Sequence, residues 1–303
     1  MSSISIQTKK FGDLDTLLSA SDEATLLIHD GKAVKTITVK NLKKDLTDRL
    51  SAIDGVLAAI NGTGAGPHNA IYRGKSLGTS VSPEQYAAIA DGTFKDLYIG
   101  DYWTISGKVY RIAGFDYFYN CGDTNCTTHH IVVVPDKSLY NAQMHKTDSG
   151  AYEAGAANTT EGGYYGSDMY KTGLDSAKET IKAAFTGHIL KHREYLVNAV
   201  TAGHPSGGGW FDSEVELMNE NMVYGTNIFL PRANGSEVYT HYTVCKGQLP
   251  LFALRHDMIG NRENWWLRDV VSASYFAHVG NDGIATYANA SNPFGVRPAF
   301  CVS

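Results

Sequence analysis

The runs Trp265-Trp266-Leu267-Arg268-Asp269 and Gly295-Val296-Arg297-Pro298-Ala299-Phe300-Cys301 bound the segment of sequence that decides the fold. Each run combines bulky apolar side chains with one arginine, and the second adds glycine and proline, whose backbones have special geometry. Adjacent residues of a strand project to opposite faces, so we expect one tryptophan to fill the core and the other to support the segment between the runs. We expect Arg268 and Arg297 to tie the runs together through hydrogen bonds to backbone or to Asp269.

The intervening segment, residues 274–294, is rich in Tyr, Ser, Asn and Gly. Antibody paratopes use these residues because Tyr supplies a large rigid contact area and the small polar residues supply adaptable hydrogen bonds. The sequence therefore predicts a recognition surface held in a structural frame, with no catalytic residue. The predicted ligand-binding residues are Ser274, Tyr275, His278, Asp282, Ile284, Thr286, Asn289, Ser291, Asn292 and Phe294, and the predicted frame residues are Trp265, Trp266, Arg268, Gly295 and Arg297.

The composition of the chain limits its class. A length of 303 residues suits one large domain with a smaller one, and 43% hydrophobic residues can form a proper core. The formal net charge of -5 argues against a nucleic-acid partner, which needs a basic stripe, and no apolar run approaches the roughly 18 residues of a membrane span. The N-terminus shows no secretory signal, so we expect synthesis in a cytoplasm and exit by another route, such as release in an assembled particle.

Two short strands and a helix are predicted near the N-terminus. Residues 24–29 and 34–39 flank Asp30-Gly31-Lys32, and Asp-Gly between such runs is a strong hairpin signal. A helix with a heptad pattern follows, and it can form a coiled coil or pack on its own domain. The glycine-rich run 61–67 comes next and favours oligomerisation, because it leaves the helix little of its own chain to pack against. The heptad positions are Leu46, Leu50, Ile53, Leu57 and Ile60.

The remainder of the chain predicts an α+β fold, with a mixed core of short strands, two helices and long glycine-rich loops. A helix is expected at 82–90, where Pro83 and Glu84 suit a helix start. The two core helices are expected at 174–185 and 189–199. Strands are expected at 97–99, 102–105, 108–112 and 131–134, and a helix or a strand at 214–224.

One cluster resembles a metal site, namely Cys121 and Cys126 followed by His129 and His130. Thiolate and imidazole are good zinc ligands. A disulfide closing a small loop, or two reduced thiols, is nevertheless the favoured interpretation. The run 207–209 lacks the lysine of a phosphate loop, and the acidic residues lack the spacing of a calcium loop. We therefore predict no metal and no cofactor.

The chain resembles two groups of proteins. Residues 26–31 and 35–42 are similar to the start of phage tail-fibre and virion structural proteins. Residues 93–303 resemble a prophage and surface-protein family with a variant of the C-type lectin fold, and both ends of the C-terminal segment look like the variable proteins of diversity-generating retroelements, a group that includes the phage tropism determinant. The matching residues are Asp101-Tyr102-Trp103, Gly162-Gly163-Tyr164, Ser167-Asp168-Met169, Glu216-Leu217-Met218, Val223-Tyr224-Gly225, Trp265-Trp266-Leu267-Arg268 and Gly295-Val296-Arg297-Pro298-Ala299-Phe300.

The resemblance to retroelement proteins implies a particular pattern of variation. In that family a reverse transcriptase copies a template with errors at adenines, which scatters asparagine codons over Tyr, Ser, His, Asp, Gly, Thr, Ile, Phe, Asn and a few others. Trp, Lys, Glu, Gln and Met cannot arise in this way. Residues 274–294 contain none of those five residue types.

The resemblance further implies a phage or prophage receptor-binding protein at the tip of a tail fibre, made in the bacterial host cytoplasm and carried in the virion. It implies a virion-attachment β region at 1–45, a short coiled-coil helix and glycine-rich linker at 46–66, and a lectin-like ligand-binding domain at 67–303 with a variable segment at 265–300. The implied partners are a host cell-surface protein or glycan, other phage tail proteins and two further copies of the chain in a homotrimer.

Two alternatives stay open. One is a non-variable adhesin or carbohydrate-binding module. The other is an enzyme of the formylglycine-generating type, which shares this fold variant and needs a reactive cysteine pair or copper-binding thiols in a cleft. Cys301 lies at the end of the frame, which suits anchoring better than catalysis.

Overall fold

The computed structural model describes residues 21, 23–29, 33–60, 64–145, 158–229 and 247–303. The chain divides into two compact units, Met1–Asn61 and Gly62–Ser303, and each is described by itself. Among the described residues, no helix is both long enough and apolar enough to cross a membrane.

A β-hairpin opens the described part of the first unit. Its strands β1 (Thr25–His29) and β2 (Val34–Thr38) pair antiparallel in an uninterrupted register. This pairing confirms the predicted hairpin, whose turn residues 30–32 lie outside the described residues.

Helix α2 (Val39–Ile60) follows β2 directly and begins before its heptad pattern. Thr38 Oγ1 accepts a hydrogen bond from Asn41 N at 3.2 Å, so the threonine caps the first turn. The predicted β region 1–45 is therefore too long, because this cap starts the helix ahead of its apolar stripe. Leu50, one of the heptad positions, is 55% exposed within the chain.

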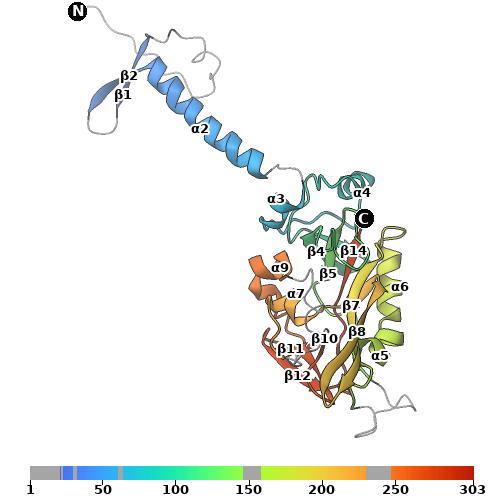
Figure 1. The fold of residues 1–303 in the computed structure, drawn as a ribbon. Coiled ribbons are helices and arrows are strands. Elements are labelled where there is room, and N and C mark those ends of the chain that lie inside the picture. Colours follow the sequence, from blue (N-terminus) through green and yellow to red (C-terminus); the bar gives the residue numbers. More distant parts are fainter. Residues whose placement is uncertain (1–20, 22, 30–32, 61–63, 146–157, 230–246) are drawn as a thin grey trace, which may run out of the picture. The chain divides into compact units, whose positions relative to one another are not determined.

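The second unit is mixed α+β, as the sequence predicts, and its described residues form two five-stranded sheets and a separate hairpin, β7-β8 (Figure 1). One sheet has the order β12-β11-β10-β13-β6 and the other the order β3-β4-β5-β14-β9. The strands are β3 (Tyr102–Ile105), β4 (Lys108–Phe115), β5 (Ile131–Pro135), β6 (Asn141–Ala142), β7 (His192–Thr201), β8 (His204–Ser213), β9 (Val215–Leu217), β10 (Trp265–Val270), β11 (Tyr275–Val279), β12 (Ala285–Asn289), β13 (Phe294–Gly295) and β14 (Pro298–Val302).

Short helices surround these sheets. Helix α4 begins with a capping box, in which Ser82 and Gln85 exchange side-chain to backbone hydrogen bonds, and it confirms the predicted helix at 82–90. Helix α6 likewise confirms the prediction at 174–185. The helices are α3 (Ala65–Asn69), α4 (Pro83–Ala90), α5 (Gly163–Gly166), the π-helix η1 (Met169–Gly173), α6 (Asp175–Ala184), α7 (Glu220–Tyr224), α9 (Pro250–Leu254) and the 3-10 helix η2 (His256–Met258).

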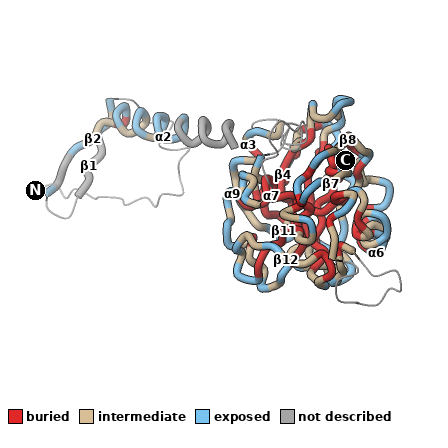
Figure 2. The backbone as a smooth tube through the Cα atoms, turned by 60° about the horizontal axis from the view of Figure 1, so that its bottom comes forward, coloured by how far each residue is buried: buried red, intermediate tan, exposed pale blue. Residues whose placement is uncertain are grey.

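One core cluster includes residues of both sheets and of the helices around them, and Figure 2 shows the buried residues gathered in the interior of the second unit. Every residue of β5 and of β14 is buried, which confirms the predicted buried strand at 131–134. Phe185, just after α6, packs against Tyr110 of β4 and Phe300 of β14, with ring centroids 5.3 and 5.1 Å apart. These aromatic contacts hold α6 onto the second sheet.

The chain passes from one sheet to the other through Gly295–Pro298. Gly295 of β13 pairs parallel with Trp265 of β10, and Pro298 opens β14, which lies between β5 and β9. A Cβ atom at Gly295 would lie 2.0 Å from Ser138 Oγ and 2.7 Å from Ser138 Cβ, so only glycine permits this approach. This short crossing ties the two sheets into one core.

The predicted helix at 189–199 is wrong, because these residues belong to the hairpin β7-β8. Ala202 and Gly203 adopt positive φ angles of 51° and 79°, the backbone that a tight hairpin turn requires. The glycine run 207–209 lies in β8, where a Cβ at Gly208 would come within 2.5 Å of the Tyr195 ring. Pairing with β8 and packing of Tyr195 on glycine outweigh the local helix preference.

Two other local predictions are also corrected. Residues 97–99 form an irregular segment, with an isolated bridge between Ile99 and Tyr72, instead of a strand. The linker predicted at 61–67 ends by Gly64, since α3 starts at Ala65. The segment 214–224 contains both alternatives, first β9 and then α7.

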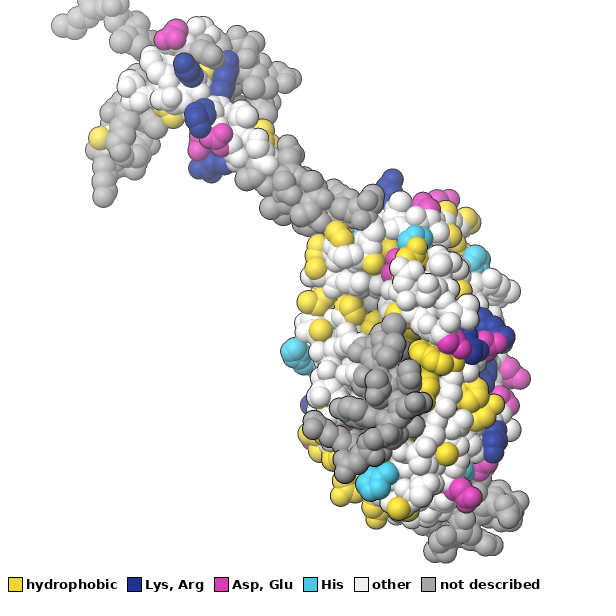
Figure 3. Space-filling model, in the orientation of Figure 1, with side chains coloured by type: hydrophobic (Ala, Val, Ile, Leu, Met, Phe, Trp, Pro, Cys, Tyr) yellow, Lys and Arg dark blue, Asp and Glu magenta, His cyan; other side chains and the backbone are white. Residues whose placement is uncertain are grey.

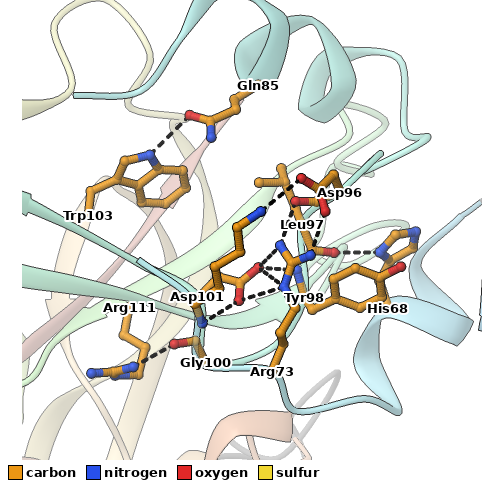
Figure 4. A network of polar contacts seen from close by, with 11 residues as sticks. His68, Arg73, Gln85, Asp96, Leu97, Tyr98, Gly100, Asp101, Trp103 and Arg111 are labelled. Carbon is orange, nitrogen blue, oxygen red and sulfur yellow. Dashed lines mark hydrogen bonds and ion pairs between the residues drawn. The ribbon is translucent and has the colours of Figure 1, made fainter. Parts of the chain in front are cut away.

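A buried carboxylate explains the irregular segment at 97–99 (Figure 4). Asp101 is 0% exposed and accepts hydrogen bonds from Arg73 Nη2 at 2.6 Å and from the backbone N–H groups of Lys75 and Tyr98, each at 2.9 Å. Asp96 also pairs with Arg73, at 2.5 Å, but its side chain is 64% exposed. Asp101 thus binds the segment after α3 to the turn that leads into β3.

We predict that Asp101→Asn lowers the free energy of unfolding by about 2–4 kcal/mol, because it removes a buried charge while its partners stay in place. Asp96→Asn removes an exposed partner of the same arginine and should cost less than about 1 kcal/mol. Denaturant titration of both variants measures the difference. Equal effects would contradict the role given to Asp101.

Candidate ligand-binding surface

The two tryptophans of the structural frame are both fully buried and have different neighbours. The Trp266 ring lies near His278 and Phe294, with centroid distances of 5.9 and 4.9 Å, and its Nε1 donates to Ala142 O at 2.9 Å. Trp265 Nε1 donates to Ile259 O at 3.3 Å. Trp266 therefore supports the segment between the two runs, while Trp265 packs elsewhere in the core.

Arg297 joins several segments from a fully buried position. Its Nε donates to Pro135 O at 2.8 Å and its Nη1 to Met258 O at 3.2 Å. The guanidinium also lies 4.9 Å from the Trp265 ring centroid, a cation–π contact. Burial lowers the pKa of Arg297 to about 10, which still leaves the side chain charged at neutral pH. Arg297 therefore donates to backbone as predicted, but to Pro135 and Met258 outside the two runs, and its contact with the first run is through the Trp265 ring.

The prediction for Arg268 needs correction. Arg268 Nη2 donates to Glu194 Oε2 of β7 at 2.5 Å. Asp269, the predicted partner, instead accepts a hydrogen bond from the backbone N–H of Glu220 at 2.8 Å. Adjacent residues of β10 face opposite ways, so Arg268 and Asp269 serve different neighbours. Arg268 thus ties β10 to the β7-β8 hairpin.

Strands β11 and β12 form an antiparallel pair at the edge of the first sheet, and the predicted binding residues lie on and around them. Because side chains alternate along a strand, the pair has two faces. We name them the tyrosine face (Tyr275, Ala277, Val279, Ala285, Tyr287 and Asn289) and the histidine face (Phe276, His278, Thr286 and Ala288). The predicted residues are therefore divided between opposite sides of the sheet.

Exposure separates the predicted residues further. Ile284 is 58% exposed, and Asp282, beside it in the turn between the strands, is also exposed. His278 is 6% exposed and Ser291 is 3% exposed, so the expectation that these two side chains are displayed is wrong. Burial lowers the pKa of His278 and favours its neutral form. Half-buried positions are Ser274, Tyr275, Thr286, Asn289, Asn292 and Phe294.

The histidine face is packed against the frame. His278 and Phe294 have ring centroids 4.5 Å apart, and both rings also contact Trp266. Thr286 lies opposite His278 in the register, on the same face. The tyrosine face is consequently the side of this strand pair on which a large aromatic side chain is exposed.

The structure adds three residues to the predicted ligand-binding residues. Tyr287 is 47% exposed, and its ring centroid lies 5.3 Å from that of Tyr275 and 5.2 Å from that of Phe229. Asn158 Nδ2 donates to Asn289 Oδ1 at 2.8 Å. Alternation along 285–289 could have identified Tyr287, because it places Tyr287 on the same face as Asn289. Phe229 and Asn158 come from distant loops, and no local pattern predicts their approach.

Metal chemistry finds no support in the described residues, which contain no group of three or more His, Cys, Asp or Glu side chains able to hold an ion. Cys121 and Cys126 are not joined to each other by a disulfide, and burial raises the pKa of Cys126. His129 Nδ1 lies 2.8 Å from Asp116 Oδ2, while His130 Nε2 accepts from the backbone of Phe118 at 3.0 Å. Cys245 lies outside the described residues.

A buried ionisable cluster lies behind the frame. Glu216 of β9 accepts a hydrogen bond from Tyr164 Oη at 2.7 Å and from Ser213 Oγ at 3.1 Å. Burial raises the pKa of Glu216 to about 7, although the Tyr164 hydrogen bond and the charge of Arg268 both oppose the shift. The fold therefore favours the protonated carboxyl of Glu216.

Residues 212–303, which run from the end of β8 through β14, match the family described as a domain of unknown function, DUF6273. This match contains the frame and the β11-β12 pair. No curated protein matches the chain. No solved structure matches it either.

We predict that Glu216 makes stability depend on pH. Its folded pKa exceeds the unfolded value of 4.5, so its contribution is complete below about pH 4.5 and is lost as pH rises through about 7. Between these limits the wild type should lose about 2–4 kcal/mol relative to Glu216→Gln, which cannot ionise. Denaturant titration at several pH values measures this, with Glu179→Gln on the exposed face of α6 as the control. Parallel curves for wild type and Glu216→Gln would contradict the assignment.

Proposed function

We propose that the chain is a phage or prophage receptor-binding protein, located at the tip of a tail fibre, that binds a host surface molecule through the tyrosine face. The observation that carries the proposal is the exposed Tyr287 beside Tyr275 and Asn289, on a strand pair fixed from behind by Trp266. Rigid aromatic side chains with adjacent amides suit non-covalent recognition. The Ile284 and Asp282 turn adjoins the same edge and extends the surface.

We also propose that the second unit is a variant of the C-type lectin fold. The residues that carry the resemblance are framework residues, which supports the proposal. Trp103, Tyr164, Met169, Trp265 and Arg297 are all at most 1% exposed. A likeness concentrated in buried positions reflects a shared core more than a shared ligand.

Programmed variation by a retroelement is the proposed origin of the surface. Substitutions at exposed positions usually change stability by less than about 0.5 kcal/mol, so side chains such as Tyr287 and Ile284 can change while the frame stays folded. His278 and Ser291 are buried and would tolerate fewer replacements. Variation would therefore be limited in practice to part of the segment 274–294.

The first unit is proposed to trimerise the chain and to attach it to other tail proteins in the virion. The exposed Leu50 on α2 supports this, because a coiled-coil partner would cover it. Three linked binding surfaces would add avidity to weak single contacts. A monomeric mass for the whole chain in solution would contradict the trimer.

The enzyme alternative has no support at the cysteine it would need. Cys301 lies in β14, is 0% exposed and pairs in register with Val132. A nucleophilic thiol must be reached by its substrate. The adhesin alternative differs from the proposal only in whether the surface varies.

We expect Tyr287→Ala to reduce adsorption of the labelled chain to host bacteria about tenfold or more, since aromatic anchors supply much of the energy at such surfaces. A panel of strains with flow cytometry measures adsorption. The matched control is Tyr165→Ala, which removes a tyrosine of α5 that is 36% exposed. This variant should leave adsorption unchanged. Unchanged adsorption of Tyr287→Ala would contradict binding through the tyrosine face.

Retroelement variation makes a separate prediction at the level of DNA. A near-copy of the sequence that encodes residues 265–300 should lie beside the gene and differ from it at positions where the copy has adenine. Sequencing the locus tests this. Mismatches spread over all four template bases would favour the non-variable adhesin.

A further inference from the structure

Three aromatic rings on and beside the tyrosine face form a corner. We name Tyr275, Tyr287 and Phe229 the aromatic corner. The Tyr275 and Tyr287 rings are tilted by 33° with centroids 5.3 Å apart, so they form a nearly continuous floor. Phe229 meets Tyr287 at 79°, with centroids 5.2 Å apart, and so stands as a wall at its side. A floor with a perpendicular wall can hold one flat, apolar face of a ligand.

Two amides lie at one side of this floor. Asn289 is opposite Tyr275 in the register of β11 and β12, and its Oδ1 accepts a hydrogen bond from Asn158 Nδ2 at 2.8 Å. Asn158 Oδ1 is buried and has no hydrogen-bond partner among the residues that the structure describes. A buried acceptor without a partner is costly, and a ligand hydroxyl would satisfy it. The corner thus offers an apolar floor and a hydrogen-bond acceptor side by side.

The five residues of the corner and its amides carry no charge. The acidic side chain next to Phe229 is that of Glu220, which is 0% exposed and accepts hydrogen bonds from the backbone of Ile228 and Phe229 at 2.9 and 3.0 Å. The carboxyl group of Glu220 therefore binds backbone N–H groups inside the fold and does not face a ligand. In the view of Figure 3, Lys, Arg, Asp and Glu gather mainly on the side of the unit where Figure 1 labels α6 and β8. The absence of charge on the five described residues of the corner and its amides favours a neutral ligand over a charged one.

We propose that the aromatic corner binds a neutral sugar ring of a host surface glycan. The inference rests on the proposed receptor-binding function and names its ligand class. A pyranose ring has one face of C–H groups and a rim of hydroxyls, which matches the tyrosine floor, the Phe229 wall and the Asn158 acceptor. Size supports the choice, because a standard protein interface buries about 800 Å² on each partner, whereas three rings and two amides suit one or two sugar units.

The test measures binding of soluble neutral oligosaccharides to the intact chain by isothermal titration calorimetry. The probes are maltotetraose, chitotetraose and mannotriose, with a hyaluronan tetrasaccharide as the acidic counterpart. We expect at least one neutral probe to bind and the acidic one to bind at least about tenfold more weakly. Tyr287→Ala should weaken the neutral probe about tenfold, whereas Tyr287→Phe, which keeps the ring, should stay within about threefold of wild type.

Tyr165→Ala is the matched control, because Tyr165 is an exposed tyrosine of α5 and is not part of the aromatic corner. It should bind the neutral probe as the wild type does. A thermal unfolding transition unchanged in Tyr287→Ala would show that lost binding does not come from lost folding. Binding of the neutral probe that survives Tyr287→Ala would overturn the inference.

Failure of the inference can be distinguished from failure of the proposed function. If no neutral probe binds while adsorption to cells still depends on Tyr287, the glycan inference is overturned and receptor binding remains. Loss of that adsorption after protease treatment of the cells would then identify a protein receptor. If adsorption is also insensitive to Tyr287→Ala, both proposals fail.

Discussion

The passage of the chain between two sheets at Gly295–Pro298 constrains the rest of the second unit. Gly295 pairs with Trp265 in one sheet, and three residues later β14 begins at Pro298 and enters the other sheet between β5 and β9. Arg297, between them, satisfies carbonyl groups of Pro135 and Met258 in a site where water is excluded. The two sheets therefore cannot shift independently. The junction also fixes the position of the edge strands.

Because the junction is fixed, the two faces of the β11-β12 pair can differ in how tightly their side chains are packed. The histidine face is packed on Trp266 and Phe294 and behaves as core, where a change of volume is felt directly. On the tyrosine face, Ala277 and Val279 of β11 are fully buried, whereas Tyr287 of β12 is 47% exposed and can be replaced without disturbing the packing on Trp266. The proposed recognition surface therefore depends on the edge strand β12, while β11 belongs mainly to the core.

The sequence predicted the parts of the fold that depend on local chemistry. The hairpin at 24–39, the Ser82 capping box and the apolar strand 131–134 each follow from neighbouring residues. It failed at 189–199, where pairing with β8 overrides helix preference. It also failed at 97–99, where the buried Asp101 carboxylate gathers backbone donors from two segments. In the candidate site, alternation could supply Tyr287, but the burial of His278 and the approach of Phe229 and Asn158 depend on tertiary contacts.

Because β14 follows residues 274–294 in the chain, a coding fault in that segment also affects the last strand. A stop codon or a shift of reading frame within that segment removes β14, which is buried along its whole length and pairs on both sides. The second sheet then loses the strand that joins β5 to β9, and the core loses five buried residues. Reading the last strand in frame is therefore a condition for the fold that holds the β11-β12 pair.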